Sequence, residues 1–421
     1  MQTGEGMERA AAGLWRSILA AAAGNVLEWY DFTVYAYMAP YIAEKFFPED
    51  DPLTGLLAVF ATFGLGFVVR PLGGILIGRL GDLKGRKAAL LLTILLMALG
   101  TAGIGLVPGR DQIGDLAPWL LVFCRLLQGF SAGGEWGSST AFIYEWAPKG
   151  RRGFFSSLQQ SSVAGGMLLG SAAAALFGSL LSKTQMAEFG WRIPFLLGVL
   201  ILPVGFYLWR YVEETPVFAA RLDKPVTLQN GMRLAVQAGG IIVIWTVAYY
   251  AILTYMPVFT ARYSHLGPAA ALWSNALSLL VLAVTIPFFG MMADRIGRKP
   301  LLLAGAGGFL LLSYPLFLLI VNSQGTAPIV LAQIVFALLT AIYSGGAPAA
   351  VTEIFPSASR LLWMSTGYSL KVALFGGFGQ YISTRLVKMT GSPLSPVLYI
   401  AGCAAISLVV ILPLKETRDD G

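Results

Sequence analysis

Long apolar runs separated by short polar connections occupy nearly the whole chain. A bilayer core of ~30 Å is crossed by about 20 predominantly apolar residues in a helix, and about twelve runs reach that length. Short segments of alternating polarity, typical of transmembrane β-strands, do not occur. The pattern therefore predicts an all-α polytopic membrane protein. The expected spans are 14–43, 53–81, 87–107, 116–147, 152–181, 191–212, 232–263, 267–294, 298–321, 326–352, 358–388 and 395–414.

Composition is wrong for an ordinary soluble protein. Of the 421 residues, 56% are hydrophobic and 12% are charged, whereas soluble domains have about 25% charged residues. No polar stretch is long enough to fold as a separate soluble domain. The polar N-terminus up to Gly13 has no short cleavable apolar core, so we expect the first span to remain a transmembrane helix.

The net charge of +7 could suggest an anionic partner such as nucleic acid, but its distribution indicates membrane topology. With a cytoplasmic N-terminus, the five cytoplasmic connections contain fourteen Lys and Arg and the six external connections contain five. Cytoplasmic loops of membrane proteins carry such an excess of cations. We therefore expect both termini in the cytoplasm, a lipid bilayer as surroundings and no nucleic-acid partner.

An internal repeat divides the chain. GDLKGRK at 81–87 matches ADRIGRK at 293–299, each directly after an apolar run. The matched acids are Asp82 and Asp294 at an offset of 212, Glu145 and Glu353 at 208, and Glu214 and Glu416 at 202. Parallel six-helix repeats are a known transporter architecture. We expect an N-terminal bundle at 1–212, a cytoplasmic linker at 213–231 and a C-terminal bundle at 232–421.

The chain resembles the major facilitator superfamily, and more narrowly its metabolite:proton symporter family. GRLGDLKGRK is similar to the superfamily's loop signature. The narrower resemblance rests on GNVLEWYDFTVYAYMAPYIAEKFFP at 24–48, GFVVRPLGGILIGRLGD at 66–82, RLLQGFSAGGEWG at 125–137, GWRIPFLLG at 190–198 and ALFGGF at 373–378. It implies a monomeric, multi-pass importer of the bacterial inner membrane, for organic acids or for osmolytes such as proline and betaine.

The repeated acid-plus-GRK segments are expected at the cytoplasmic mouth of each bundle. There a carboxylate can face a helix N-terminus or an arginine and hold an inner gate closed. The alternative is that the cations only enforce topology. The candidate gate residues are Asp82, Arg86, Glu145, Arg152, Asp294, Arg298, Glu353 and Arg360.

Ionisable residues within the spans are the main functional signal, because each costs at least ~2.5–3.5 kcal/mol at a helix centre. Glu28 and Asp31 are three residues apart and share a helical face with Asn25. We expect this polar stripe to face a central cavity. The alternative is that one carboxylate pairs with Arg70 or Arg125 only to hold helices together.

The proton-coupling candidates are Glu28, Asp31 and Glu135. Of these, Glu135 acts either as a proton carrier or as the counter-ion of an arginine. The only histidine, His265, falls in a predicted external connection, so a proton must be carried by a carboxylate. We expect no metal and no cofactor beyond the coupling ion, with sodium as an open alternative to the proton.

Lys371 is predicted near mid-membrane, where an ammonium must be paired or readily deprotonated. It is either a substrate ligand or the partner of a buried carboxylate. Each tyrosine alone could instead be an interfacial residue. The expected substrate-binding residues are Asn25, Tyr30, Arg70, Arg125, Gln128, Gln159, Gln160, Tyr250, Tyr343, Tyr368 and Lys371.

Three cavity cations, Arg70, Arg125 and Lys371, favour a proton-coupled symporter for a di- or tricarboxylate. The alternatives are a proline- or betaine-type zwitterion held by tyrosines and tryptophans, a carboxylate siderophore, an exporter or exchanger, or a non-transporting sensor. We expect no enzymatic activity, since the sequence contains no P-loop or Rossmann glycine pattern.

Overall fold

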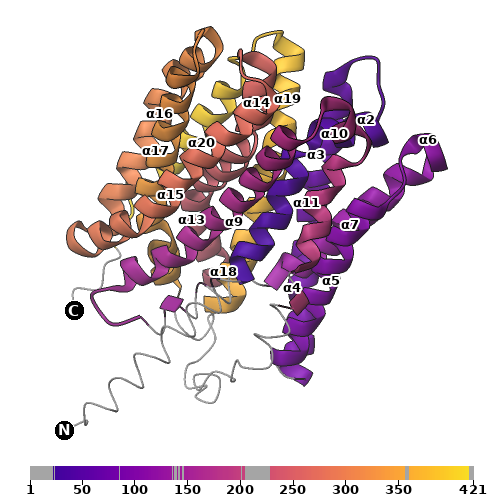
Figure 1. The fold of residues 1–421 in the computed structure, drawn as a ribbon. Helices are drawn as coiled ribbons and strands as arrows, with labels where there is room; N and C mark the ends of the chain where they lie inside the picture. The colour runs from indigo at the N-terminus through magenta and orange to yellow at the C-terminus, as the bar shows by residue number, and fades with distance from the viewer. Residues whose placement is uncertain are drawn as a thin grey trace, which may run out of the picture.

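The computed structural model describes residues 22, 24–84, 86–134, 136, 140, 143–144, 147–200, 202–203, 228–355 and 360–416, and the regular elements within them are helical. The helices stand side by side. Those of the first half of the chain lie mostly on one side of the molecule and those of the second half on the other, but the helix at 152–180 packs against the helix at 268–296 of the second half (Figure 1).

The first half begins with a helical run at 24–37. The elements that follow are α2 (Ala39–Phe46), α3 (Pro52–Val68), α4 (Arg70–Lys84), α5 (Arg86–Leu106), α6 (Arg110–Ile113), α7 (Leu116–Ser131), η1 (Ala132–Gly134), α9 (Arg152–Leu180), α10 (Lys183–Glu188), η2 (Gly190–Arg192), α11 (Ile193–Leu197) and η3 (Gly198–Leu200).

The second half contains two π-helical segments, each inserted between α-helices. Its elements are α13 (Leu228–Val247), the π segment η5 (Ala248–Thr254), α14 (Met256–Tyr263), α15 (Pro268–Ile296), α16 (Arg298–Asn322), α17 (Thr326–Ile354), α18 (Arg360–Lys371), the π segment η7 (Val372–Gly377), α19 (Gly379–Thr390) and α20 (Pro396–Ile411).

The predicted fold class is confirmed. Within the described residues, six helices are long and apolar enough to cross a membrane, and four shorter helices are also apolar. The run from 24 to 46 and the run from 360 to 390, interrupted by η7, supply the two remaining predicted spans. Residues 204–227 lie outside the described part, so the predicted linker and bundle boundaries stay predictions.

The helix ends follow local sequence signals. Asp51 precedes Pro52, and its side chain accepts a hydrogen bond from the Leu53 N–H at 3.0 Å, which caps α3. At the other end of the molecule, Gly297 separates α15 from α16 with a φ of +100°. A side chain would strain that conformation, so glycine allows the sharp turn between these two helices.

Small residues let helix backbones approach closely, as the glycine-rich run after Gln128 indicates. A Cβ atom added to Gly129 would lie 1.7 Å from the Gly66 carbonyl oxygen, and one added to Gly133 would lie 2.0 Å from that of Arg70. Close backbone packing of this kind stabilises helix pairs in lipid, where apolar burial contributes little. It also places the polar residues of α4 and α7 next to one another.

Candidate functional site

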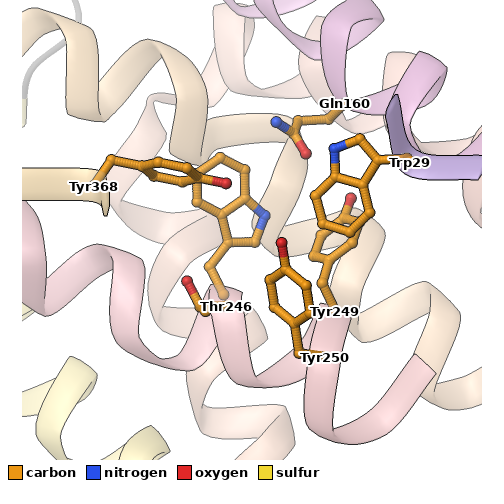
Figure 2. A pocket seen from close by; sticks show the side chains of 7 residues that line it. Trp29, Gln160, Thr246, Tyr249, Tyr250 and Tyr368 are labelled. Carbon is orange, nitrogen blue, oxygen red and sulfur yellow. The ribbon is translucent and has the colours of Figure 1, made fainter. Parts of the chain in front are cut away.

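A small cavity lies between helices from the two halves of the chain (Figure 2). Its empty space, which includes open solvent, is about 230 Å³. The lining residues are Trp29 from the first helical run, Gln160 from α9, Trp245 and Thr246 from α13, Tyr249 and Tyr250 from η5, and Tyr368 from α18.

Aromatic rings form most of the cavity wall. The Trp29 ring centroid lies 5.7 Å from that of Tyr249 and 5.2 Å from that of Tyr250. On the opposite side, Tyr368 is stacked on Trp136, with centroids 3.7 Å apart and planes 9° apart. Five aromatic side chains line the space, and none of the described residues that line it has a carboxyl or amino group. Such a wall presents electron-rich faces rather than fixed charges.

Hydrogen bonds fix the orientation of two of these rings. Ser344 of α17 accepts a bond from Trp245 Nε1 at 2.9 Å, and its oxygen lies 3.3 Å from the Tyr249 hydroxyl. The Tyr250 hydroxyl, in contrast, is buried, interacts with the Arg70 guanidinium and points toward the cavity (Figure 2). It has no other hydrogen-bond partner among the described residues, so it is available to a bound molecule.

The π segment η5 explains how neighbouring tyrosines reach the same cavity. Consecutive residues of an α-helix point about 100° apart, and a π-helix has more residues per turn, so this angle is smaller. Tyr249 and Tyr250 both line the space. π-helical segments occur often at functional sites because they redirect side chains in this way.

An ion pair lies beside the cavity. Arg70 of α4 donates from its NH2 nitrogen to Glu28 Oε1 at 2.6 Å, and both side chains are at most 5% exposed. The guanidinium also lies over the rings of Phe32 and Phe67, with 5.0 and 4.8 Å to the ring centroids. Glu28 is therefore paired with Arg70, which is what the alternative interpretation of the polar stripe expected for one of its carboxylates.

A hydrogen-bonded chain connects the other predicted charges. Asp31 accepts from the Thr101 hydroxyl at 2.8 Å, Thr101 accepts from Gln128 Nε2 at 2.7 Å, and Gln128 accepts from Arg125 at 2.6 Å. Arg125 is fully buried, and its Nε and NH2 groups have no hydrogen-bond partner. The structure therefore brings Arg125, Gln128 and Asp31 together, but behind the aromatic wall rather than on it.

Other predicted substrate ligands lie away from the cavity lining. Tyr30 donates to the Pro194 carbonyl at 2.8 Å, and Tyr343 donates to that of Ile241 at 2.7 Å, so each hydroxyl braces a neighbouring helix. Lys371 is half-buried, and its aliphatic stem lies against Gly239 of α13.

Three amide side chains and one acid complete the set. Gln160 lines the cavity and donates to Gln159 Oε1 at 2.6 Å. Asn25 is buried, and its amide nitrogen has no hydrogen-bond partner. Glu135 lies outside the described residues, so its predicted coupling role stays a prediction.

At the predicted cytoplasmic end, the second acid-plus-GRK segment contacts the first half of the chain. The Asp294 carboxylate accepts from the backbone N–H groups of Gly153 at 2.7 Å and Phe154 at 2.8 Å, at the N-terminus of α9. It also lies 3.2 Å from Arg298. A carboxylate at a helix N-terminus accepts hydrogen bonds from free N–H groups and interacts favourably with the helix dipole. This contact has the geometry that we expected of a gate residue.

The remaining gate candidates are partly described. Arg298 lies 3.3 Å from Glu353, and Arg152 donates to the Tyr144 hydroxyl at 3.0 Å. Glu145 lies outside the described residues, and the side chains of Asp82, Arg86 and Arg360 are likewise not described. The first acid-plus-GRK segment therefore stays a prediction.

A contact at the opposite end of the molecule was not predicted from the sequence. Lys388 of α19 lies 2.7 Å from Asp51 and is also hydrogen-bonded to Thr54, both at the start of α3. The hydrogen bond from Lys388, with those from Thr54 and the Leu53 N–H, lowers the pKa of Asp51 to about 2. Both residues fall in predicted external connections, where charges are common, so neither stood out.

Sequence reasoning also missed the tryptophans of the wall. Trp29, Trp136 and Trp245 were not among the expected ligands, because tryptophan in a membrane helix is more often an interfacial or packing residue. One feature of the sequence could have identified Trp29. It directly follows Glu28 of the polar stripe, and it lies too deep in the predicted span to be an interfacial residue.

Known proteins resemble the chain over most of its length. The family model described as "Sugar (and other) transporter" matches residues 17–229 and 224–420. The proline/betaine transporter of Escherichia coli K12 is 32% identical over 426 residues, which cover 96% of this chain and 84% of that protein. The glycine betaine/proline/ectoine/pipecolic acid transporter OusA of Dickeya dadantii is 32% identical over 432 residues, with the same coverage.

Solved structures share the fold at low sequence identity. A crystal structure of the D-xylose–proton symporter has a TM-score of 0.78 and 18% identity, covering 95% of this chain and 98% of that one. The major facilitator superfamily proton:xylose symporter XylE bound to 6-bromo-6-deoxy-D-glucose has a TM-score of 0.78 and 16% identity, with 97% of each chain covered. At this identity the likeness shows the fold alone.

The predicted di- or tricarboxylate substrate is wrong. The two relatives described above, which match nearly the whole chain, are named for proline, betaine and related compounds rather than for di- or tricarboxylates. The charge count on which the prediction rested placed Lys371 in the cavity wall, where the structure does not have it. The chain belongs to the sugar (and other) transporter family, and it is a multi-pass inner-membrane transporter of the major facilitator superfamily.

Proposed function

We propose that the protein is a secondary transporter that carries glycine betaine, proline or a similar small zwitterion together with a proton, by alternating access. The observation that carries the proposal is the aromatic wall of Trp29, Trp245, Tyr249, Tyr250 and Tyr368. A quaternary or secondary ammonium is attracted to the faces of such rings, and the attraction is strongest where water is excluded.

The polar groups beside the wall suit the other end of a zwitterion. Tyr250 presents its hydroxyl to the cavity, and Thr246 and Gln160 add further polar atoms to the lining. Arg70 lies close enough to Tyr250 and Tyr368 to interact electrostatically with both. The substrate carboxylate therefore has hydrogen-bond donors to meet within a small molecule's length of the rings.

Among the described residues, two buried acids, Glu28 and Asp31, are available for proton coupling. An ionisable residue at this depth is costly and is by default a functional one. The relatives named for proline and betaine support the substrate class, while the coupling ion is inferred from these carboxylates.

Uptake into proteoliposomes under an imposed proton gradient tests the proposal. We expect accumulation of betaine and proline but not of di- or tricarboxylates, and we expect collapse of the gradient to abolish it. Trp29→Ala should raise the KM for betaine by roughly 5–30-fold, the equivalent of losing about 1–2 kcal/mol of cation–π attraction.

The matched control for that variant is Trp119→Ala, since Trp119 on α7 is 71% exposed and lies away from the cavity. It should leave the KM unchanged. Equal effects of the two substitutions, or uptake of dicarboxylates in place of betaine, would contradict the proposed function.

A further inference from the structure

The Arg70–Glu28 pair lies next to residues that line the aromatic cavity. Glu28 directly precedes Trp29, and Arg70 interacts electrostatically with Tyr250 and Tyr368. All three of those aromatic residues line the cavity. The pair therefore lies immediately behind the wall, at the tyrosine side.

Arg70 has unused hydrogen-bonding capacity. Its Nε group is buried without a partner, although its NH2 group donates to Glu28 at 2.6 Å. The adjacent Tyr250 hydroxyl interacts with the same guanidinium and has no other partner among the described residues. A guanidinium can hold a carboxylate through two parallel hydrogen bonds. The Arg70 guanidinium thus has an N–H group without an acceptor, and a substrate carboxylate can supply that acceptor.

We propose that the substrate carboxylate displaces Glu28 from Arg70, and that the displaced Glu28 then takes up the proton that is transported with the substrate. The inference rests on the proposed function, because it requires a zwitterion in the aromatic cavity. With its ammonium against the rings of Trp29 and Trp245, the zwitterion directs its carboxylate toward Tyr250 and Arg70.

Charge balance links the two events. Before binding, Arg70 and Glu28 neutralise each other, and the net-neutral zwitterion adds one further carboxylate to the same cation. Glu28 then remains buried with the Asp31 carboxyl nearby and no cation of its own. An unpaired buried carboxylate is unfavourable, so it accepts a proton from water and becomes neutral.

The groups that face Glu28 favour this exchange. Arg70 faces it from α4, Asp31 from its own helix, Tyr250 from η5 and Tyr368 from α18. The two tyrosines are neutral hydroxyls at physiological pH. Arg125 is engaged with Gln128 and lies over the rings of Phe32, Tyr35 and Phe63. Arg70 is therefore the one cation in this group that pairs directly with Glu28.

By thermodynamic reciprocity, substrate binding then favours proton binding, and proton binding favours the substrate equally. Release on the other side of the membrane reverses both steps. The proton leaves Glu28, the carboxylate returns to Arg70, and the original pair reforms. The exchange thus provides symport without a histidine or a dedicated proton channel.

Betaine binding to the purified full-length protein in detergent, measured as a function of pH, tests the exchange. The wild-type affinity should weaken by about tenfold per pH unit as pH rises, the slope for one coupled proton. Glu28→Gln should bind betaine at least as tightly as the wild type and show no such slope. Glu44→Gln, at an exposed acid of α2, is the matched control and should keep it.

A second measurement needs no substitution at the site. In weakly buffered solution, betaine should cause net proton uptake by the wild-type protein, whereas choline, which has the same cation but no carboxylate, should bind without it. Equal proton uptake with choline would overturn the exchange, as would an unchanged pH slope in Glu28→Gln. Absence of betaine binding to the wild type would instead contradict the proposed function itself.

Discussion

A single glycine keeps the cavity open. A Cβ atom on Gly376 of η7 would lie 2.3 Å from Thr246 Cγ2 and 2.7 Å from Tyr250 Cδ2, both side chains of the cavity wall. Any larger residue must push these side chains into the binding space. Glycine is therefore required here for close approach between two π segments, not for a special backbone angle.

We predict that Gly376→Ala weakens betaine binding by roughly 5–30-fold, because overpacking of this kind costs about 1–2 kcal/mol. The measurement is the KM for uptake together with the melting temperature. Gly402→Ala on α20 is the control, since a Cβ there would meet nothing within 4 Å. A variant at Gly376 that binds betaine like the control would show that the tyrosine wall does not contact substrate.

At the residue scale, the sequence predicted which polar groups are buried but not how they pair. The three-residue spacing of Glu28 and Asp31 indicated a polar stripe on one helical face, and both are at most 3% exposed. Neither residue lines the cavity that the stripe was expected to face. Their different partners, Arg70 and Thr101, depend on how other helices are placed against that stripe. Spacing along one helix carries no information about those neighbours.

At the scale of elements, the N-terminus of α9 is held by a residue from the second half of the chain. Asp294 accepts two backbone N–H bonds there, and close packing between α9 and α15 surrounds the contact, with Gly290 against Ser157. Separation of these two helices must break both hydrogen bonds. The contact is therefore suited to hold one end of the molecule closed.

We predict that Asp294→Asn opens this end more often. The charge at the helix N-terminus contributes about 1–2 kcal/mol, so the open population should rise roughly 5–30-fold. The measurement is the labelling rate of Ser157→Cys by a water-soluble thiol reagent, with low background because Cys124 and Cys403 are buried. Glu188→Gln, at the exposed last residue of α10, should not change the rate. An unchanged rate in Asp294→Asn would refute a gating role.

The repeat in the sequence predicted this contact because the acid and its GRK run recur at a fixed offset. The contact between Lys388 and Asp51 at the opposite end has no such repeat. An isolated lysine at a helix end is also typical of plain helix-dipole stabilisation. Its partner could be found only once α3 and α19 were placed side by side.

At the scale of the whole molecule, two contacts join the halves at opposite ends, one between α15 and the start of α9 and one between α19 and the start of α3 (Figure 1). Alternating access requires one of them to open while the other stays closed. Because its pKa is lowered to about 2, Asp51 is ionised at every physiological pH, and its attraction to Lys388 is lost only in strong acid. The proposed proton coupling is therefore assigned to the buried carboxylates rather than to this contact.

The overall architecture was predictable because apolar run length and bilayer thickness determine it directly. The substrate class was not, because counting charges along the chain treated Lys371 as part of the cavity and overlooked the tryptophans. Whether a membrane-embedded side chain faces a cavity or a neighbouring helix depends on helix rotation, which the spans alone do not specify. The aromatic wall is visible only in the assembled structure.

The most direct test of the account compares glycine betaine with tert-butylacetate, which has the same shape and carboxylate but a carbon in place of the quaternary nitrogen. Competition against labelled betaine in the wild-type protein isolates the attraction between the cation and the rings. We predict that tert-butylacetate competes at least roughly tenfold more weakly, as expected for a desolvated cation–π site. Equal competition by the two compounds would contradict recognition by the aromatic wall.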